Sequence, residues 1–169
     1  MKLIYDSTSK SPDLLYLTGF HAPDPIIYFE ISRKKHLVLN DLEYERGLCE
    51  SKVDKIMRLS DFIDSKKNNS LEDILSRIIK EMKIEKIIVP YSFPSYLFQK
   101  LPKKINKEIL DTNIFCKERL IKSKEEIKKI KLIMSKTEKV MGEIIKIIKY
   151  SKIRNNYLLH NSKHLTSEY

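Results

Sequence analysis

The chain has 169 residues and a formal net charge of +10; 41% of its residues are hydrophobic and 33% are charged. This composition is that of a soluble globular protein with one ordinary domain and some length beyond it, and it excludes a low-complexity chain. The longest uninterrupted apolar runs, such as residues 14–17, are too short to span a bilayer, and the start MKLIYDSTSK has no signal-peptide stretch, so we expect a cytoplasmic protein without a membrane partner.

The first part of the chain predicts alternating strands and helices. Pro12 is a residue that the first turn of a helix tolerates, and Gly19 ends the helix that begins there. Asn40 precedes Glu43 by three residues, which is a capping-box pattern. The predicted elements are a strand at 1–5, a helix at 12–17, a hairpin of strands 26–30 and 36–40, a helix capped by Asn40 that runs to about Glu50, and a strand at 55–59.

The same alternation continues to residue 116. Ser70 and Asp73 begin a helix through about Met82, whose apolar residues follow helical spacing. Around it the sequence predicts a loop at 64–70, a buried strand at 84–89, a short helix at 93–101 and a last strand at 109–114. These elements predict an α/β fold, a mixed β-sheet flanked by helices on both faces.

Residues 117–122 have the mixed charge of a linker, and a long helix follows. Ser123 and Glu126 form a second capping-box pattern, and the helix is expected to run to about Tyr150, a length of about 40 Å. Ile and Met residues recur along it every three or four positions, which predicts a continuous apolar stripe. The 19 residues that follow are too few and too polar to cover this stripe. The chain is therefore expected to begin a second domain and to stop before completing it.

Most of the positive charge lies on this late helical part. Between Lys117 and Arg154 there are 13 Lys or Arg and 5 Glu. The segment lacks the interleaved aromatic residues of a single-strand nucleic-acid binder. A solvated basic face is therefore the preferred interpretation.

The sequence contains no recognisable catalytic motif. Its glycines stand alone, so no phosphate-binding loop exists, and Asn161 occupies the place where a zinc-protease motif that used His160 and His164 would need Glu. Cys49 and Cys116 match no metal spacing, and we expect two buried or half-buried free thiols.

Five stretches of the chain resemble, in order, the amino-terminal part of creatinase/prolidase-type metallopeptidases (family M24), the Xaa-Pro dipeptidases and Xaa-Pro aminopeptidases. The stretches are SPDLLYLTGFHAPDPIIYFE, HLVLNDLEYERG, KVDKIMRLSDFID, IIVPYSFPSYLFQKL and ERLIKSKEEIKKIKLIM. The resemblance implies an N-terminal α/β domain of ribonuclease H-like fold at 1–116, a linker at 117–122, and the truncated start of a "pita-bread" catalytic domain at 123–169. There, LLHNSKHLTSEY is similar to a hairpin followed by the start of the next helix.

The resemblance also implies where the chemistry lies. Members of the family hold two divalent metals of the Mn, Co or Zn type through two Asp, one His and two Glu, all downstream of the first long helix. No position of this chain matches such a ligand, so the resemblance implies no catalytic residue, no metal or other cofactor in this chain, and no peptidase activity from it alone. In the family, loops at the position of Phe20 and His21 can face the substrate pocket across the dimer. The resemblance therefore implies that these two candidate site residues wall a pocket that this chain does not itself contain.

Three functions remain open at this point. The first is a non-catalytic N-terminal domain of an Xaa-Pro metallopeptidase that serves dimerisation and pocket walling, with proline-containing peptides as substrates of the intact enzyme. The second is one half of a split peptidase that is active only with a second chain. The third is a basic nucleic-acid-binding protein. We expect a homodimer or a partner chain that supplies the catalytic domain; dipeptidase and aminopeptidase ancestry are not separated.

Overall fold

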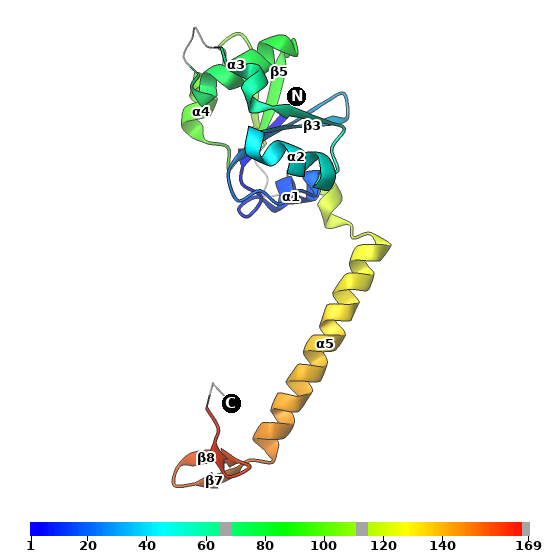
Figure 1. Cartoon of the computed structure of the whole chain (residues 1–169), viewed down its shortest axis with the longest axis vertical. Coiled ribbons are helices and arrows are strands. Elements are labelled where there is room, and N and C mark those ends of the chain that lie inside the picture. The colour runs from blue at the N-terminus through cyan, green and yellow to red at the C-terminus, as the bar shows by residue number, and fades with distance from the viewer. Residues whose placement is uncertain (65–68, 111–114, 167–169) are drawn as a thin grey trace. The chain divides into compact units, whose positions relative to one another are not determined.

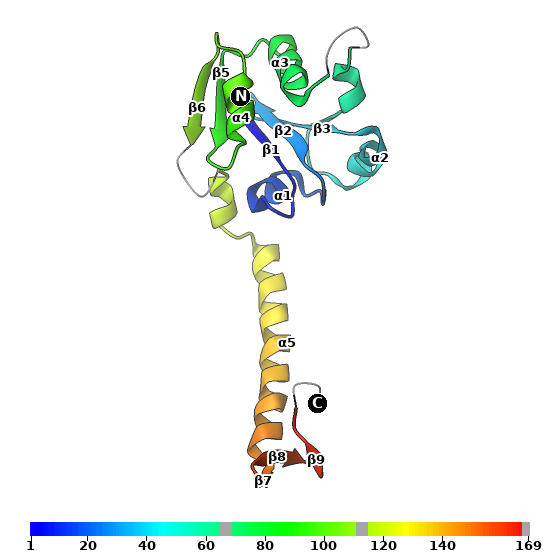
Figure 2. The ribbon, with the colours of Figure 1, turned by 90° about the vertical axis from the view of Figure 1, so that its left-hand side faces the viewer.

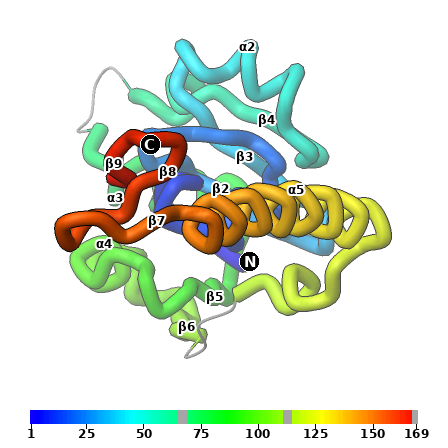
Figure 3. Tube along the Cα trace, turned by 90° about the horizontal axis from the view of Figure 1, so that it is seen from below, coloured from blue at the N-terminus to red at the C-terminus, as the bar shows by residue number. Residues whose placement is uncertain are grey.

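The computed structural model describes residues 1–64, 69–110 and 115–166, which form two compact units, Met1–Leu120 and Ile121–Tyr169. The boundary between the units falls inside the predicted linker 117–122. The first unit is the upper part of Figure 1, and its six strands form a mixed sheet in the order β4-β3-β2-β1-β5-β6. Figure 3 shows β4 and β6 at the opposite ends of this sheet. The strands are β1 (Lys2–Asp6), β2 (Ile26–Ile31), β3 (Lys34–Leu39), β4 (Lys55–Arg58), β5 (Lys86–Pro90) and β6 (Asn106–Leu110).

The sheet joins a hairpin to a set of parallel strands. β2 pairs antiparallel with both β1 and β3, whereas β1 pairs parallel with β5, β5 with β6, and β3 with β4. The predicted mixed sheet is thereby confirmed. The last strand, β6, begins three residues earlier than predicted. Its polar residues 106–108 pair with β5 at the edge of the sheet, where polar side chains are favoured. The rest of the predicted strand, 111–114, lies outside the described residues.

Helices cover the two faces of the sheet. The helices are α1 (Pro12–Thr18), α2 (Asp41–Glu50), α3 (Leu71–Glu81) and α4 (Ser95–Lys100), with short 3-10 turns η1 (Leu59–Phe62) and η2 (Lys117–Leu120). Successive residues of a strand point to opposite faces, so Leu3 of β1 packs in the core with α3 and α4, while its neighbour Ile4 packs with α1. Figure 2 shows α3 and α1 on opposite sides of β1 and β2.

The predicted helix boundaries are set by caps. Ser11 Oγ accepts the Leu14 N–H, and Gly19 ends α1 with a φ of 62°, a left-handed conformation that glycine adopts without strain. Asn40 Oδ1 accepts the Glu43 N–H at 2.8 Å, as predicted. The predicted return bond of the capping box is replaced, because the Glu43 carboxylate pairs with Arg46 one turn later.

In the second unit, α5 (Lys124–Lys149) is the predicted long helix, with its capping box complete. Ser123 Oγ accepts the Glu126 N–H at 3.2 Å, and the Glu126 carboxylate accepts the Ser123 N–H at 2.7 Å. A small antiparallel sheet follows, made of β7 (Lys152–Arg154), β8 (Tyr157–His160) and β9 (Lys163–His164). The β8–β9 hairpin confirms the predicted one; most of the helix start expected after it falls in 167–169, outside the described residues. In the described parts of the chain no helix has the length and apolarity needed to cross a membrane.

One polar group in the core of the first unit has no described hydrogen-bond partner. Tyr28 on β2 is fully buried, and no described group bonds to its hydroxyl. Burial, followed by the nearby acidic groups and Cys116, strongly raises the pKa of Tyr28, so the hydroxyl is neutral at every ordinary pH.

Replacing Tyr28 with Phe removes this hydroxyl and keeps the ring. Because an unsatisfied buried hydroxyl is costly, we expect Tyr28→Phe to raise the free energy of unfolding by about 1 kcal/mol. Urea unfolding followed by circular dichroism measures this. The matched control is Tyr16→Phe, whose hydroxyl is at the surface, and it should change stability little. A Tyr28→Phe protein less stable than the wild type would contradict the assignment.

The α5 capping box makes a pH prediction. Its hydrogen bonds to Ser123 lower the pKa of Glu126 below the usual 4.5. A carboxylate with a lowered folded-state pKa stabilises the folded form above its unfolded pKa and loses that contribution as the pH falls through the folded value. We therefore expect the first turn of α5 to loosen only below pH 4.5, with NMR titration of the Glu126 carboxyl carbon as the measurement. In Ser123→Ala, which removes the side-chain hydrogen bond of the capping box, the Glu126 midpoint should rise; an unchanged midpoint would contradict the prediction.

Candidate functional site

The loop that follows α1 carries the two predicted site residues, Phe20 and His21. Phe20 is fully buried in the core cluster that contains Leu14 and Tyr28, whereas His21 is exposed. Phe20 therefore anchors the loop to the first unit, and only His21 presents its side chain to solvent. Their role as a wall of a substrate pocket stays a prediction.

Arg46 of α2 holds this loop in place. Its guanidinium carbon lies 4.5 Å from the centroid of the Phe20 ring, and its Nη2 donates to the His21 carbonyl oxygen. The same guanidinium pairs with Glu43 and Glu50 on its own helix. A planar cation with several fixed donors can make all these contacts at once. α2 therefore fixes the backbone at His21.

The residues considered as metal ligands are not gathered in one place. In the ranges that the structure describes, no group of three or more His, Cys, Asp or Glu side chains is positioned to hold a metal ion. The His164 ring stacks on Tyr157 with centroids 4.8 Å apart, and His160 pairs with Lys163 across the β8–β9 hairpin. Both histidines are thus part of the small sheet.

The two cysteines differ in environment. Cys116 is buried, as predicted, and its thiol donates to the Glu118 carboxylate at 3.2 Å. Burial and this bond raise the pKa of Cys116, so the thiol stays protonated near neutral pH. The prediction of a buried or half-buried thiol is wrong for Cys49, which is exposed on α2 because the helix directs Gly47 and not its neighbours toward the sheet. A Cβ at Gly47 would lie 2.3 Å from the end of the Leu39 side chain, so a larger residue there would require that buried side chain to move.

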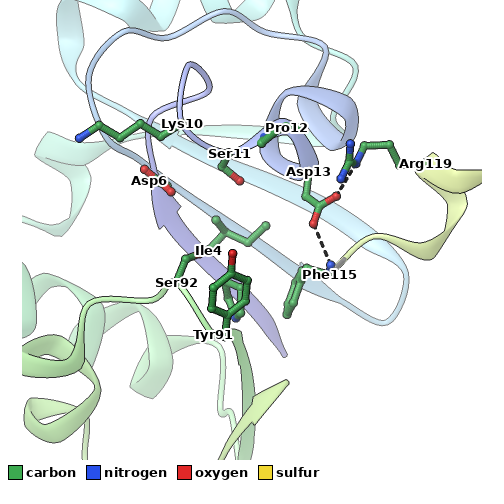
Figure 4. Close-up of a pocket in the computed structure, with 11 residues that line it drawn as sticks. Ile4, Asp6, Lys10, Ser11, Pro12, Asp13, Tyr91, Ser92, Phe115 and Arg119 are labelled. Carbon is green, nitrogen blue, oxygen red and sulfur yellow. Dashed lines mark hydrogen bonds and ion pairs between the residues drawn. The ribbon is translucent and has the colours of Figure 1, made fainter. Parts of the chain in front are cut away.

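A pocket of about 270 Å³ opens where β1 and β5 end (Figure 4), and we call it the strand-end pocket. Residues after β1, at the start of α1, after β5 and near η2 line it. Its polar lining includes Asp6, Ser11, Asp13, Tyr91, Ser92 and Arg119. The pocket is therefore built from four segments that are distant in the sequence.

One edge of the strand-end pocket is closed by an ion pair across 106 residues of sequence. Asp13 is 8% exposed; one carboxylate oxygen accepts from Arg119 Nε at 2.7 Å, and the other accepts from the Phe115 N–H at 2.7 Å (Figure 4). A buried carboxylate requires such partners. This contact attaches η2, which was predicted to be a linker, to the first unit.

The second unit exposes a broad apolar surface on its long helix. No residue of α5 is buried, and its side chains at helical spacing remain 42–60% exposed. We call this surface the α5 apolar face; its residues are Ile127, Ile130, Ile133, Met134, Val140, Met141, Ile144, Ile145 and Ile148. The predicted stripe is confirmed.

Comparison with solved structures identifies the fold. The prolidase from Pyrococcus horikoshii OT3 superposes with a TM-score of 0.59 at 22% sequence identity, over 89% of this chain and 39% of that chain. The X-Pro aminopeptidase from Thermotoga maritima MSB8 gives 0.63 at 16% identity, over 86% and 40%. The Xaa-Pro dipeptidase from Bacillus anthracis gives 0.55 at 16% identity, over 75% and 33%. No protein-family model and no curated protein matches the sequence.

At these low sequence identities, the structural similarity shows a shared fold and nothing more. The predicted fold, that of a creatinase/prolidase N-terminal domain followed by a long helix, is confirmed by it. The chain spans 33–40% of the length of these solved proteins.

The Asp13 contact supplies a stability prediction. Asp13→Ala leaves the Arg119 guanidinium and the Phe115 N–H without their carboxylate, and we expect the free energy of unfolding to fall by about 3 kcal/mol. Amide hydrogen exchange should also quicken at residues 115–120. The matched control is Glu108→Ala, which removes the exposed Lys86–Glu108 pair and should cost less than about 1 kcal/mol. Equal losses for the two variants would contradict a structural role for Asp13.

Proposed function

We propose that this chain is the N-terminal module of an Xaa-Pro metallopeptidase and contributes assembly surfaces, not catalytic groups. The observation that carries the proposal is the shared fold, since the solved proteins that share it are named as a prolidase, an X-Pro aminopeptidase and an Xaa-Pro dipeptidase. A fold by itself is an argument by analogy. The proposal therefore also depends on what the described residues offer to a partner.

The metal chemistry of such a peptidase requires ligands beyond those described here. Two divalent cations of the Mn, Co or Zn type would activate the water that hydrolyses the bond before proline. The described side chains do not fit this role, since they form no metal-binding group. We therefore derive no step of hydrolysis from this chain, and a catalytic domain would hold the metals and the proline-containing peptide.

The α5 apolar face supports the assembly role. Exposed apolar surface of this extent marks an interface in soluble proteins. The surface belongs to the second unit, which in the proposal begins the catalytic domain. Its occupant is either a second copy, giving a homodimer, or a polypeptide that supplies the rest of that domain, as in a split peptidase. His21, held by Arg46 at the surface of the first unit, would face the substrate pocket of such an assembly.

The charge on α5 separates this proposal from nucleic-acid binding. The helix carries eight Lys and four Glu, so two copies in contact would repel each other electrostatically. Salt screens that repulsion and strengthens apolar association, whereas it weakens binding to nucleic acid through counterion release. The sign of the salt dependence therefore distinguishes the two functions.

The test is the association of the purified chain, measured by sedimentation equilibrium. We expect association that strengthens with salt and weakens at least tenfold in Ile133→Lys and Ile144→Lys. Leu132→Lys is the matched control. Leu132 is 57% exposed and its neighbour Ile133 is 60% exposed, but Leu132 lies about 100° further around the helix axis and is outside the α5 apolar face. A chain that stays monomeric would exclude a second copy as the occupant of the α5 apolar face. Binding to single-stranded DNA with an affinity that falls steeply in salt would contradict the assembly role.

A further inference from the structure

The strand-end pocket lies at a point where the chain diverges. After β1 the chain passes to the face of the sheet covered by α1, and after the adjacent parallel strand β5 it passes to the opposite face, covered by α4. Two neighbouring strands whose connections separate in this way leave a crevice at their carboxyl ends, and this crevice is where α/β sheets bind ligands. The pocket therefore occupies a ligand-binding position of the fold, and the proposed peptidase role makes no use of it.

Hydroxyl groups dominate the uncommitted polar atoms of the pocket. Ser11 Oγ accepts the Leu14 N–H, which leaves its own proton free to be donated. Between described residues, no hydrogen bond uses the hydroxyl of Tyr91 or Ser92. Figure 4 shows the Ser11 and Tyr91 hydroxyls pointing toward each other, with the Ile4 side chain between them in this view. Asp6, at the end of β1, adds a carboxylate whose Oδ1 accepts the Ser7 N–H.

The charges of the lining do not call for a charged ligand. Asp13 is neutralised by Arg119, and Figure 4 shows the Lys10 side chain pointing away from the other lining groups. An anion would therefore find no uncommitted cation inside the pocket. A cation would find a single unpaired carboxylate, that of Asp6, and one of its oxygens already accepts the Ser7 N–H.

We propose that the strand-end pocket binds a small, neutral, hydroxyl-rich molecule such as a cyclic polyol or monosaccharide. Asp6 accepts a hydrogen bond from one ligand hydroxyl, and the hydroxyls of Ser11, Tyr91 and Ser92 donate to and accept from others. Ile4 and the rings of Tyr91 and Phe115 contact the C–H face of the ligand. The volume of about 270 Å³ lies just below the roughly 300–1,000 Å³ usual for pockets that hold drug-sized ligands, which suits a smaller molecule.

The experiment is an NMR titration of the ¹⁵N-labelled chain with two probes, myo-inositol and D-ribose. We expect at least one probe to give saturable shifts at the amides of Asp6, Ser11 and Ser92, with a Kd on the order of 1–10 mM. Propionate and propylammonium are the charged probes of similar size, and neither should saturate in this range. The proposal is overturned if either charged probe gives saturable shifts, or if neither neutral probe does.

Variants confirm that the pocket is the site. Tyr91→Phe and Asp6→Asn should each weaken binding about tenfold, because each removes one hydrogen bond to the ligand. Tyr96→Phe is the matched control. Tyr96 is as exposed as Tyr91 (57% and 58%), but only Tyr91 lines the pocket, so the Kd of the Tyr96→Phe variant for the probe should be unchanged. If Asp6→Asn does not fold, the exposed Ser92→Ala replaces it. Equal affinities for wild type, Tyr91→Phe and Ser92→Ala overturn the assignment.

Discussion

The first unit depends on the position of β1 in the centre of its sheet. β1 is hydrogen-bonded to β2 of the β2–β3 hairpin on one side and to the parallel strand β5 on the other. It therefore joins the half of the sheet formed by β2, β3 and β4 to the half formed by β5 and β6. Its side chains alternate between the two cores, with Leu3 in one and Ile4 in the other. A one-residue slip of this strand would exchange every side chain between the cores. Both the helix layers and the strand-end pocket follow from this register.

Much of this arrangement could be predicted from local sequence signals. Asn40, Ser70 and Ser123 each accept the N–H three residues later, and these caps placed the helices to within one or two residues. The apolar spacing of α3 identified its buried face because a helix of period 3.6 repeats its contacts locally. Signals within a few residues therefore gave the element order and the mixed sheet.

The remaining features depend on partners that no local pattern reveals. Asp13 could be predicted only as an acidic residue in a first helical turn, since its partners Phe115 and Arg119 lie more than 100 residues away. The start of β6 was missed because its first residues are polar and are recruited by pairing with β5. The strand-end pocket has the same character: its lining residues fit no motif, and only the divergence of two connections brings them together.

The two units differ in how their apolar side chains are covered. The first unit buries its apolar side chains on both faces of a sheet and is stabilised within itself, whereas α5 retains all of its apolar residues at least partly exposed. An isolated helix of this length is supported by its capping box and by pairs such as Glu143–Lys146, which are worth only tenths of a kcal/mol each. Most helical stability in proteins comes from tertiary packing, so α5 gains its stability from whatever covers its apolar face. The strand-end pocket needs no such cover, because all the residues that line it belong to the first unit. Ligand binding in that pocket and assembly through α5 are therefore physically separable properties of this chain.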